Sequence, residues 1–308
     1  MSVRPPDRDG LGASAVALPA GDWATVLEFL VHRFPAINRD EWLRRMASGQ
    51  VLDEHGGDVA ADTSYRAHSK VFYYRRQDDE PRIPFEATVL FRDDWLVVAD
   101  KPHFLPVTPA GRYVQETLLV RLKRQLGIAT LAPIHRIDRD TAGLVLFSVQ
   151  PGTRDAYQRL FRERTVEKLY EAIAPWRGDI AWPVTRRSRL IESPQFMQMQ
   201  EVDGDANAET HVSVIDASGS TACYRLQPAT GQKHQLRAHM AALGVPIVND
   251  RIYPVLQAPD STLPDFSAPL QLLARSIAFR DPVSGQQRRF ESARSLACWP
   301  APGESASL

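Results

Sequence analysis

Hydrophobic residues recur along this 308-residue chain with two different spacings. Between residues 22 and 49 they recur every three or four positions, which predicts two helices separated at Pro35. Further helical spacing occurs near residues 115–126, 153–161 and 230–243. Alternating or continuous apolar runs, which are typical of strands, occur near residues 50–52, 71–74, 88–91, 95–98, 144–147, 168–174, 210–215, 221–226 and 272–290. This irregular order of strands and helices, with several hairpins, predicts an α+β fold with a mixed or antiparallel sheet and helices packed against it.

The same pattern divides the chain into three parts. Residues 1 to 20 are rich in proline, glycine, alanine and aspartate, a composition that predicts disorder. Residues 21 to 80 hold the first two predicted helices and two short strands, which indicates a small α/β domain. After a linker at residues 82–84, we expect a larger domain over residues 85 to 300.

Charge is unevenly distributed, although the formal net charge is zero. Residues 101 to 190 contain 16 Lys or Arg against 8 Asp or Glu, which leaves 21 against 29 for the rest of the chain. A basic middle region is typical of a surface that binds phosphates. The alternative is that each basic cluster is only the solvated face of a helix or loop. The candidate clusters are Arg121-Lys123-Arg124, Arg159-Arg162-Arg164 and Arg186-Arg187-Arg189.

Several features bear on compartment, cofactors and assembly. Cys223 and Cys298 lie far apart in the chain, and this spacing favours a reduced, cytoplasmic compartment. No apolar run is long enough to span a membrane, and no signal-peptide pattern is present, so we expect no membrane partner. The chain has no Walker motif, dinucleotide fingerprint or metal-ligand cluster, so we expect neither a cofactor nor a metal. No oligomerisation pattern is evident, which favours a monomer.

The polar segment His135–Gly143, followed by the apolar run Leu144–Phe147, is the strongest candidate for chemistry. This order predicts a loop at the edge of a sheet, where Gly143 lets the backbone turn or approach another group closely. Asp138 lies between two arginines, and a carboxylate beside guanidinium groups stays ionised at neutral pH, as a nucleophile must. The alternative is a structural Asp–Arg ion pair where the strand begins.

This segment resembles the central motif of the RluA-type pseudouridine synthases, whose pattern is His-Arg-hydrophobic-Asp-Arg-x-Thr-Ser/Ala-Gly. Two more family motifs are matched in the same order, at Glu167-Lys168-Leu169-Tyr170 and at residues 226–239, which include Thr230-Gly231-Gln232-Lys233-His234-Gln235-Leu236-Arg237-Ala238-His239. Asp100-Lys101-Pro102 and Leu243–Ile247 resemble weaker landmarks. The resemblance covers about residues 85 to 295 and rests on three ordered motifs.

The resemblance implies a mixed, mostly antiparallel sheet with flanking helices and a central cleft. It also implies an enzyme that isomerises specific uridines in ribosomal or transfer RNA without a cofactor. Asp138 would be the catalytic carboxylate, Tyr170 would stack on the target base, and Arg237 would pair with Asp138. The implied substrate contacts are Arg136, Arg139, Thr141, Lys168 and His234. His234 and His239 are five positions apart, which is unsuitable for two metal ligands on one helix face. We expect them to bond RNA or to be structural.

Residues 21 to 80 resemble the small RNA-binding domain that precedes many pseudouridine synthases. They hold 8 basic and 11 acidic side chains, so RNA contact would need a local face such as Arg39, Arg44 and Arg45. A packing domain without RNA contact is the alternative.

Three departures from the family pattern bear on substrate choice: Gln232 replaces an arginine, Ala142 replaces the commoner serine, and residues 272–274 lack a histidine. Two other functions stay open. One is a catalytically silent RNA-binding or ribosome-assembly protein on the same scaffold. The other is an Asp/His hydrolase, which the absence of a Gly-x-Ser-x-Gly motif disfavours.

Overall fold

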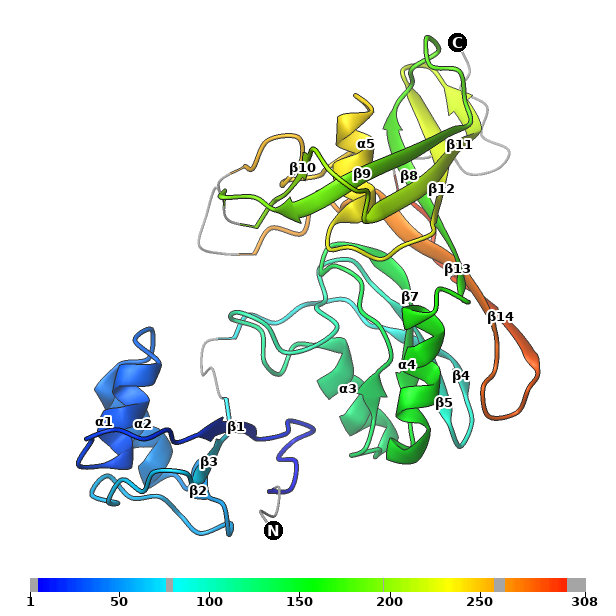
Figure 1. The fold of residues 1–308 in the computed structure, drawn as a ribbon. Coiled ribbons are helices and arrows are strands. Elements are labelled where there is room, and N and C mark those ends of the chain that lie inside the picture. The colour runs from blue at the N-terminus through cyan, green and yellow to red at the C-terminus, as the bar shows by residue number, and fades with distance from the viewer. Residues whose placement is uncertain (1–4, 76–79, 196, 258–263, 298–308) are drawn as a thin grey trace. The chain divides into compact units, whose positions relative to one another are not determined.

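The computed structural model describes residues 5–75, 80–195, 197–257 and 264–297 (Figure 1). The chain forms two compact units. The smaller comprises Met1–Glu80 with Ala110–Gln115 and Val120–Ala129, and the larger comprises Pro81–Pro109, Glu116–Leu119 and Thr130–Leu308. The smaller unit therefore extends beyond the predicted boundaries, because it recruits residues before position 21 and two segments after position 109.

The smaller unit packs two helices on a three-stranded antiparallel sheet of order β1-β3-β2. Its elements are β1 (Ser14–Ala17), α1 (Val26–Arg33), α2 (Arg39–Ala47), β2 (Val51–Asp53) and β3 (Lys70–Tyr73). The predicted helices and both predicted strands are confirmed. The expectation of disorder is wrong for β1, because its residues pair with β3. Thr25 and Asn38 cap the two helices by accepting hydrogen bonds from the backbone N–H groups of Glu28 and Glu41.

The larger unit is built on one 11-stranded sheet of order β10-β9-β11-β12-β8-β13-β7-β5-β4, with β14 paired to β13 and β6 to β7. Its strands are β4 (Thr88–Arg92), β5 (Leu96–Lys101), β6 (Ala132–Pro133), β7 (Ala142–Ser148), β8 (Glu167–Pro175), β9 (Val184–Glu192), β10 (Met199–Val202), β11 (Ala208–Ser218), β12 (Thr221–Pro228), β13 (Leu272–Arg280) and β14 (Gln287–Glu291). Its helices are α4 (Arg154–Arg162), after the 3₁₀ turn η1 (Pro151–Thr153), and α5 (Gln235–Ala242). The remaining helix, α3 (Leu118–Leu126), begins in this unit and continues in the smaller one.

Two local expectations differ from the structure. Strands β9 and β10 are not among the predicted strands. The less exposed positions of β9 include Arg186 and Ser188, so apolar residues do not alternate with polar ones along it. The last predicted helix begins at Gln235 rather than at Thr230, because His234 has a left-handed backbone with φ of 52°. The loop that precedes α5 is therefore longer than predicted.

The centre of the sheet is the contact between β7 and β13. Among the described strands it is the parallel pairing in an otherwise antiparallel sheet, with Ala142 opposite Leu273 and Gly143 opposite Ala274. Gly143 has φ of 108°, and a Cβ there would lie 2.3 Å from the carbonyl oxygen of Ala274. The expected close backbone approach at Gly143 is confirmed. Since residues 135–141 immediately precede β7, this contact brings the polar loop to the middle of the sheet.

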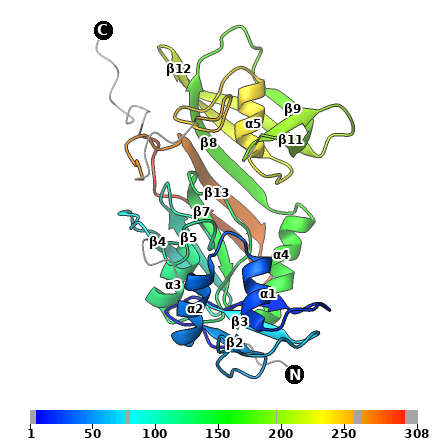
Figure 2. The ribbon, with the colours of Figure 1, turned by 90° about the vertical axis from the view of Figure 1, so that its left-hand side faces the viewer.

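Helices α4 and α5 cover the same face of the sheet at opposite ends (Figure 2). Helix α4 packs with Ile277 of β13, which lies opposite Lys168 of β8. Helix α5 packs with Leu272 of β13 and with Ala172 of β8, which are also paired. Lys168 and Tyr170 therefore lie on this face between the two helices, as the period-2 spacing predicts.

Candidate active site

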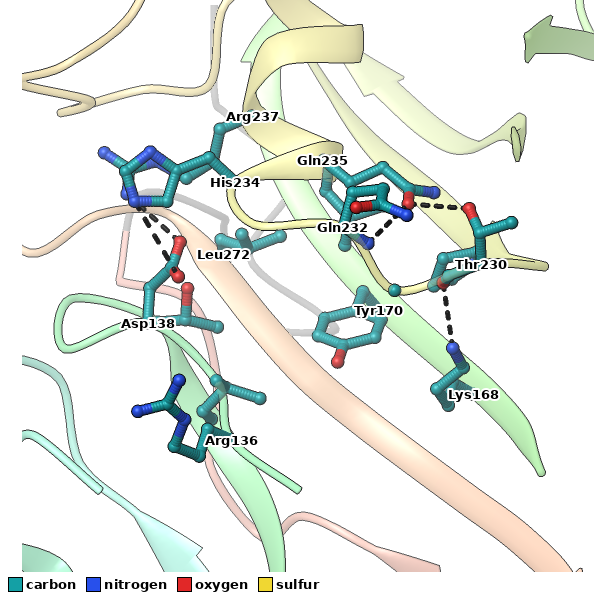
Figure 3. A pocket seen from close by; sticks show the side chains of 15 residues that line it. Arg136, Asp138, Lys168, Tyr170, Thr230, Gln232, His234, Gln235, Arg237 and Leu272 are labelled. Carbon is teal, nitrogen blue, oxygen red and sulfur yellow. Dashed lines mark hydrogen bonds and ion pairs between the residues drawn. The ribbon is translucent and has the colours of Figure 1, made fainter. Parts of the chain in front are cut away.

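A pocket opens on the face of the sheet between α4 and α5 and has a volume of about 110 Å³ (Figure 3). All three predicted catalytic residues line it: Asp138, Tyr170 and Arg237. Four of the predicted substrate contacts line it too, namely Arg136, Thr141, Lys168 and His234. Arg139 does not line the pocket; its Nε atom donates to Asp140 Oδ1 at 2.9 Å, and not to Asp138, for which the sequence left a structural ion pair open.

The loop that carries Asp138 is held by a buried lysine. Lys101 is fully buried, and its Nζ donates to the carbonyl oxygens of Pro102, Leu105 and Arg139, at 3.0, 2.8 and 2.8 Å. Burial lowers the pKa of Lys101 to about 7, although the charges of Asp140 and Asp138 oppose this. The family resemblance marked this position only as a landmark, and the structure shows that it supports the loop.

Arg237 connects Asp138 to a second carboxylate. Its guanidinium is 2% exposed, and Nη1 donates to Asp138 Oδ2 at 3.1 Å. The other edge forms a bidentate pair with Asp250, from Nε at 2.8 Å and from Nη2 at 2.7 Å. Burial disfavours the charge on Arg237, but the hydrogen bonds and charge of Asp250, with a smaller effect of Asp138, raise its pKa above the usual value. The expected pairing of Arg237 with Asp138 is present, whereas no pattern in the sequence identified Asp250 as the main partner of Arg237.

Tyr170 and Lys168 form the wall of the pocket on β8 (Figure 3). Burial and the charge of Asp138 raise the pKa of the Tyr170 hydroxyl, so it stays protonated at neutral pH. Lys168 Nζ donates to the carbonyl oxygen of Thr230 at 3.0 Å. Burial lowers the pKa of Lys168 to about 8, and Arg164 adds to the effect. The charge of Lys168 is therefore sensitive to pH near the physiological range.

The side chain of Gln235 forms hydrogen bonds with two residues of the loop that precedes α5. Its Oε1 accepts from the Thr230 hydroxyl at 2.7 Å and from the backbone N–H of Gln232 at 3.0 Å. His234 lies in the same loop, and its Nε2 faces Asp138, 3.9 Å from Oδ1. Burial lowers the pKa of His234, although the charge of Asp138 opposes this. His239, by contrast, is fully buried against Ser188 and Thr210, which is the structural alternative.

Most of the basic clusters that the sequence suggested are engaged in ion pairs. Arg159 and Arg162 both bond Asp155, and Arg187 bonds Glu209. In the candidate RNA-facing cluster of the smaller unit, Arg44 and Arg45 both pair with Glu41, and Arg45 is also buried. Lys123 pairs with Asp7, and Arg186 pairs with Glu201. These side chains are therefore better explained as charged groups of the protein surface, paired with carboxylates, than as a phosphate-binding surface.

Comparison with known proteins decides the family. A family model described as RNA pseudouridylate synthase matches residues 95–242. An RNA pseudouridine synthase from Synechocystis is 30% identical over 230 residues, which cover 74% of this chain and 79% of that protein. The chain belongs to the RNA pseudouridine synthase family. It is therefore an isomerase of the RluA type, as the three sequence motifs indicated.

Other relatives and a solved structure agree. The ribosomal large subunit pseudouridine synthase D of Pseudomonas aeruginosa is 31% identical, over 67% of this chain and 68% of that protein. The mitochondrial tRNA pseudouridine(32) synthase of Saccharomyces cerevisiae is 30% identical, over 74% of this chain and half of that protein. The human RNA pseudouridylate synthase domain containing 4 has a TM-score of 0.52 at 26% identity, over 68% of this chain and 88% of that one. These similarities confirm the mixed, mostly antiparallel fold.

Outside the pocket, the comparisons and the helices bear on the smaller unit and on membrane spans. The matched region begins at residue 95, so an RNA-binding role for residues 21–80 stays a prediction. Within the described parts of the chain, every helix is too short or too polar to cross a membrane.

Proposed function

We propose that this chain isomerises specific uridines in ribosomal or transfer RNA, with Asp138 as the reacting carboxylate. The observation that carries the proposal is the pocket itself. Asp138, Tyr170 and Arg237 come from three distant segments of the chain and line one opening beside a buried ion pair. Two of the relatives named above are a tRNA pseudouridine synthase and a ribosomal large subunit pseudouridine synthase, which supports the same class of substrate.

The reaction breaks the N–C glycosidic bond of uridine, rotates the base and rejoins it to the sugar through carbon. Three routes fit an ionised Asp138: attack on the sugar carbon, attack on the pyrimidine ring, or deprotonation of the ribose. In each route Arg237 keeps the carboxylate oriented, since its Nη1 donates to Oδ2. Every heavy atom of the base is retained, and the hydrogen on C5 is replaced by one on N1. The residues therefore need only hold the detached base in place and move protons.

The target base must leave its stack to reach the pocket, at a cost of a few kcal/mol. The Tyr170 ring offers a stacking surface, and stacking of a base on an aromatic side chain contributes about 1–3 kcal/mol. Because its hydroxyl stays protonated, Tyr170 can donate a hydrogen bond to the base but is a poor general base. Stacking therefore offsets part of the cost of extruding the base.

Cations around the pocket provide contacts for the flanking phosphates. Arg136 lines the pocket and is exposed, and among the described residues it makes no hydrogen bond or ion pair. Arg164 is exposed and likewise unengaged in the described part of the chain, and it acts electrostatically on Lys168. We assign Arg136, Arg164 and Lys168 to RNA phosphates, in preference to the arginines of α4 that pair with Asp155.

The deciding experiment replaces the carboxylate with its amide. Asp138→Asn keeps the side-chain shape and leaves Arg237 paired with Asp250, so we expect normal folding and RNA binding. Tritium release from RNA labelled at uridine C5 should fall to background, because an amide cannot act as nucleophile or base. Full activity of this variant would remove Asp138 from the mechanism. RNA binding without tritium release by the unmodified chain would favour the catalytically silent RNA-binding function instead.

A further inference from the structure

Tyr253 contacts both groups that face Asp138, although it lies outside the three sequence motifs. Its ring centroid is 5.5 Å from the guanidinium carbon of Arg237. The ring also meets His234 edge-on, with centroids 5.8 Å apart and an interplanar angle of 84°. Tyr253 is 6% exposed, so both contacts are shielded from water. Because Tyr253 contacts both Arg237 and His234, it can influence how both side chains are oriented toward the Asp138 carboxylate.

Asp250 fixes the turn that places Tyr253. Its Oδ1 accepts the backbone N–H groups of Ile252 and Tyr253, at 2.8 and 3.0 Å, and also accepts Nη2 of Arg237. Since the Asp250 side chain is fully buried, these bonds are not exchanged for water. The same carboxylate therefore orients Arg237 and the backbone that carries Tyr253.

The contacts of the Tyr253 hydroxyl bear on which nitrogen of His234 carries the proton. The backbone N–H of Met199, which can only donate, reaches the Tyr253 oxygen at 2.7 Å. The hydroxyl proton is then available to His234 Nδ1, which lies 3.3 Å away. In a neutral imidazole that accepts at Nδ1, the proton is on Nε2. Nε2 is the atom that faces Asp138 Oδ1, at 3.9 Å.

We propose that Tyr253 is a positioning residue that holds His234 as the neutral Nε2–H tautomer, directed at Asp138 Oδ1. Arg237 holds Oδ2, so each oxygen of the carboxylate faces one N–H group while only one of the two donors is charged. At 3.9 Å the His234 contact is too long for a hydrogen bond, and a small movement of the ring would complete it. Burial keeps the imidazole neutral against Asp138 and Asp250, and Arg237 and Lys233 act in the same direction as burial.

The tautomer can be read directly by NMR of ¹⁵N-labelled histidine, with the His234 signals assigned through His234→Gln. We expect a protonated Nε2 and an unprotonated Nδ1 in the unmodified chain. Tyr253→Phe keeps the ring contacts and removes the hydroxyl, so the His234 signals should shift toward a mixture of tautomers. Tyr224→Phe is the matched control, because its buried hydroxyl donates to the Pro175 carbonyl at 2.8 Å, away from the pocket.

The kinetic part of this inference rests on the proposed function. Tyr253→Phe should lower kcat for tritium release about tenfold with little change in KM, which is the effect of losing one hydrogen bond that matters in the transition state. Tyr224→Phe should change neither value. A His234 proton on Nδ1, or identical His234 signals in the Tyr253→Phe variant, would overturn the inference. An unmodified chain without any activity would overturn the proposed function instead, and the NMR signals would still decide the tautomer.

Discussion

Replacing Gly143 with alanine tests whether the central strand contact positions the catalytic loop. The added Cβ would lie 2.3 Å from the Ala274 carbonyl oxygen and 2.7 Å from its backbone nitrogen. Neither atom can move alone, because both belong to β13 in the middle of the sheet. Strands β7 and β13 would therefore have to separate where their two parallel pairs lie.

Gly143→Ala is expected to lower the stability of the fold in two ways, through backbone strain and through steric overlap. An alanine with φ of 108° is strained, which costs on the order of 1–3 kcal/mol. Relieving the overlap adds a packing cost of roughly 1–3 kcal/mol. The sum, about 2–6 kcal/mol, is a large fraction of the 5–15 kcal/mol that typically stabilises a domain. Since Asp138 lies five residues before Gly143, a local separation of the strands would also move the carboxylate away from Arg237.

The free energy of unfolding is measured by urea denaturation, with tritium release measured in parallel. Gly285→Ala is the matched control, because Gly285 also has a positive φ, 73°, but a Cβ there would meet nothing within 4 Å. The control should lose only about 1–2 kcal/mol, from backbone strain. If Gly143→Ala proved no more destabilising than Gly285→Ala and kept full activity, the close approach of β7 to β13 would not be what positions the loop.

Three further predictions follow from the charges of the pocket. Arg237→Met leaves Asp250 buried without its partner and should cost about 3–5 kcal/mol in urea denaturation; adding Asp250→Asn should recover part of that loss, and no recovery would contradict the pairing. Arg136→Gln should reduce the slope of log affinity for RNA against log salt by about one, measured by filter binding, with an unchanged slope as the contrary result. RNA affinity should fall as pH rises through about 8, because Lys168 then loses the charge that attracts phosphate; Lys168→Met should lack this fall, and equal pH dependence in both proteins would exclude the contact.

The sequence alone was sufficient for the elements whose signals are local. The helical spacing predicted α2, and the apolar runs predicted the strands that carry Tyr170 and Gly143. The family motifs supplied Asp138, Tyr170 and Arg237 together, because the order and internal spacing of motifs can be read without a fold. Strand β9 was not predicted because several of its less exposed positions are also polar. The alternation of apolar and polar residues that marks a half-buried strand is therefore absent.

Only the tertiary structure decided which charged side chains around the pocket pair with each other. The residues beside Asp138 in the sequence suggested Arg136 or Arg139 as its partner, whereas the family motifs suggested Arg237. In the structure Arg139 pairs with Asp140, and Asp138 pairs with Arg237 from a position 99 residues away. The buried partner Asp250 and the hydroxyl that orients His234 carry no local pattern at all. The physical reason is that a hydrogen bond depends on distances of about 3 Å between side chains, and only the folded chain determines which distant segments come that close.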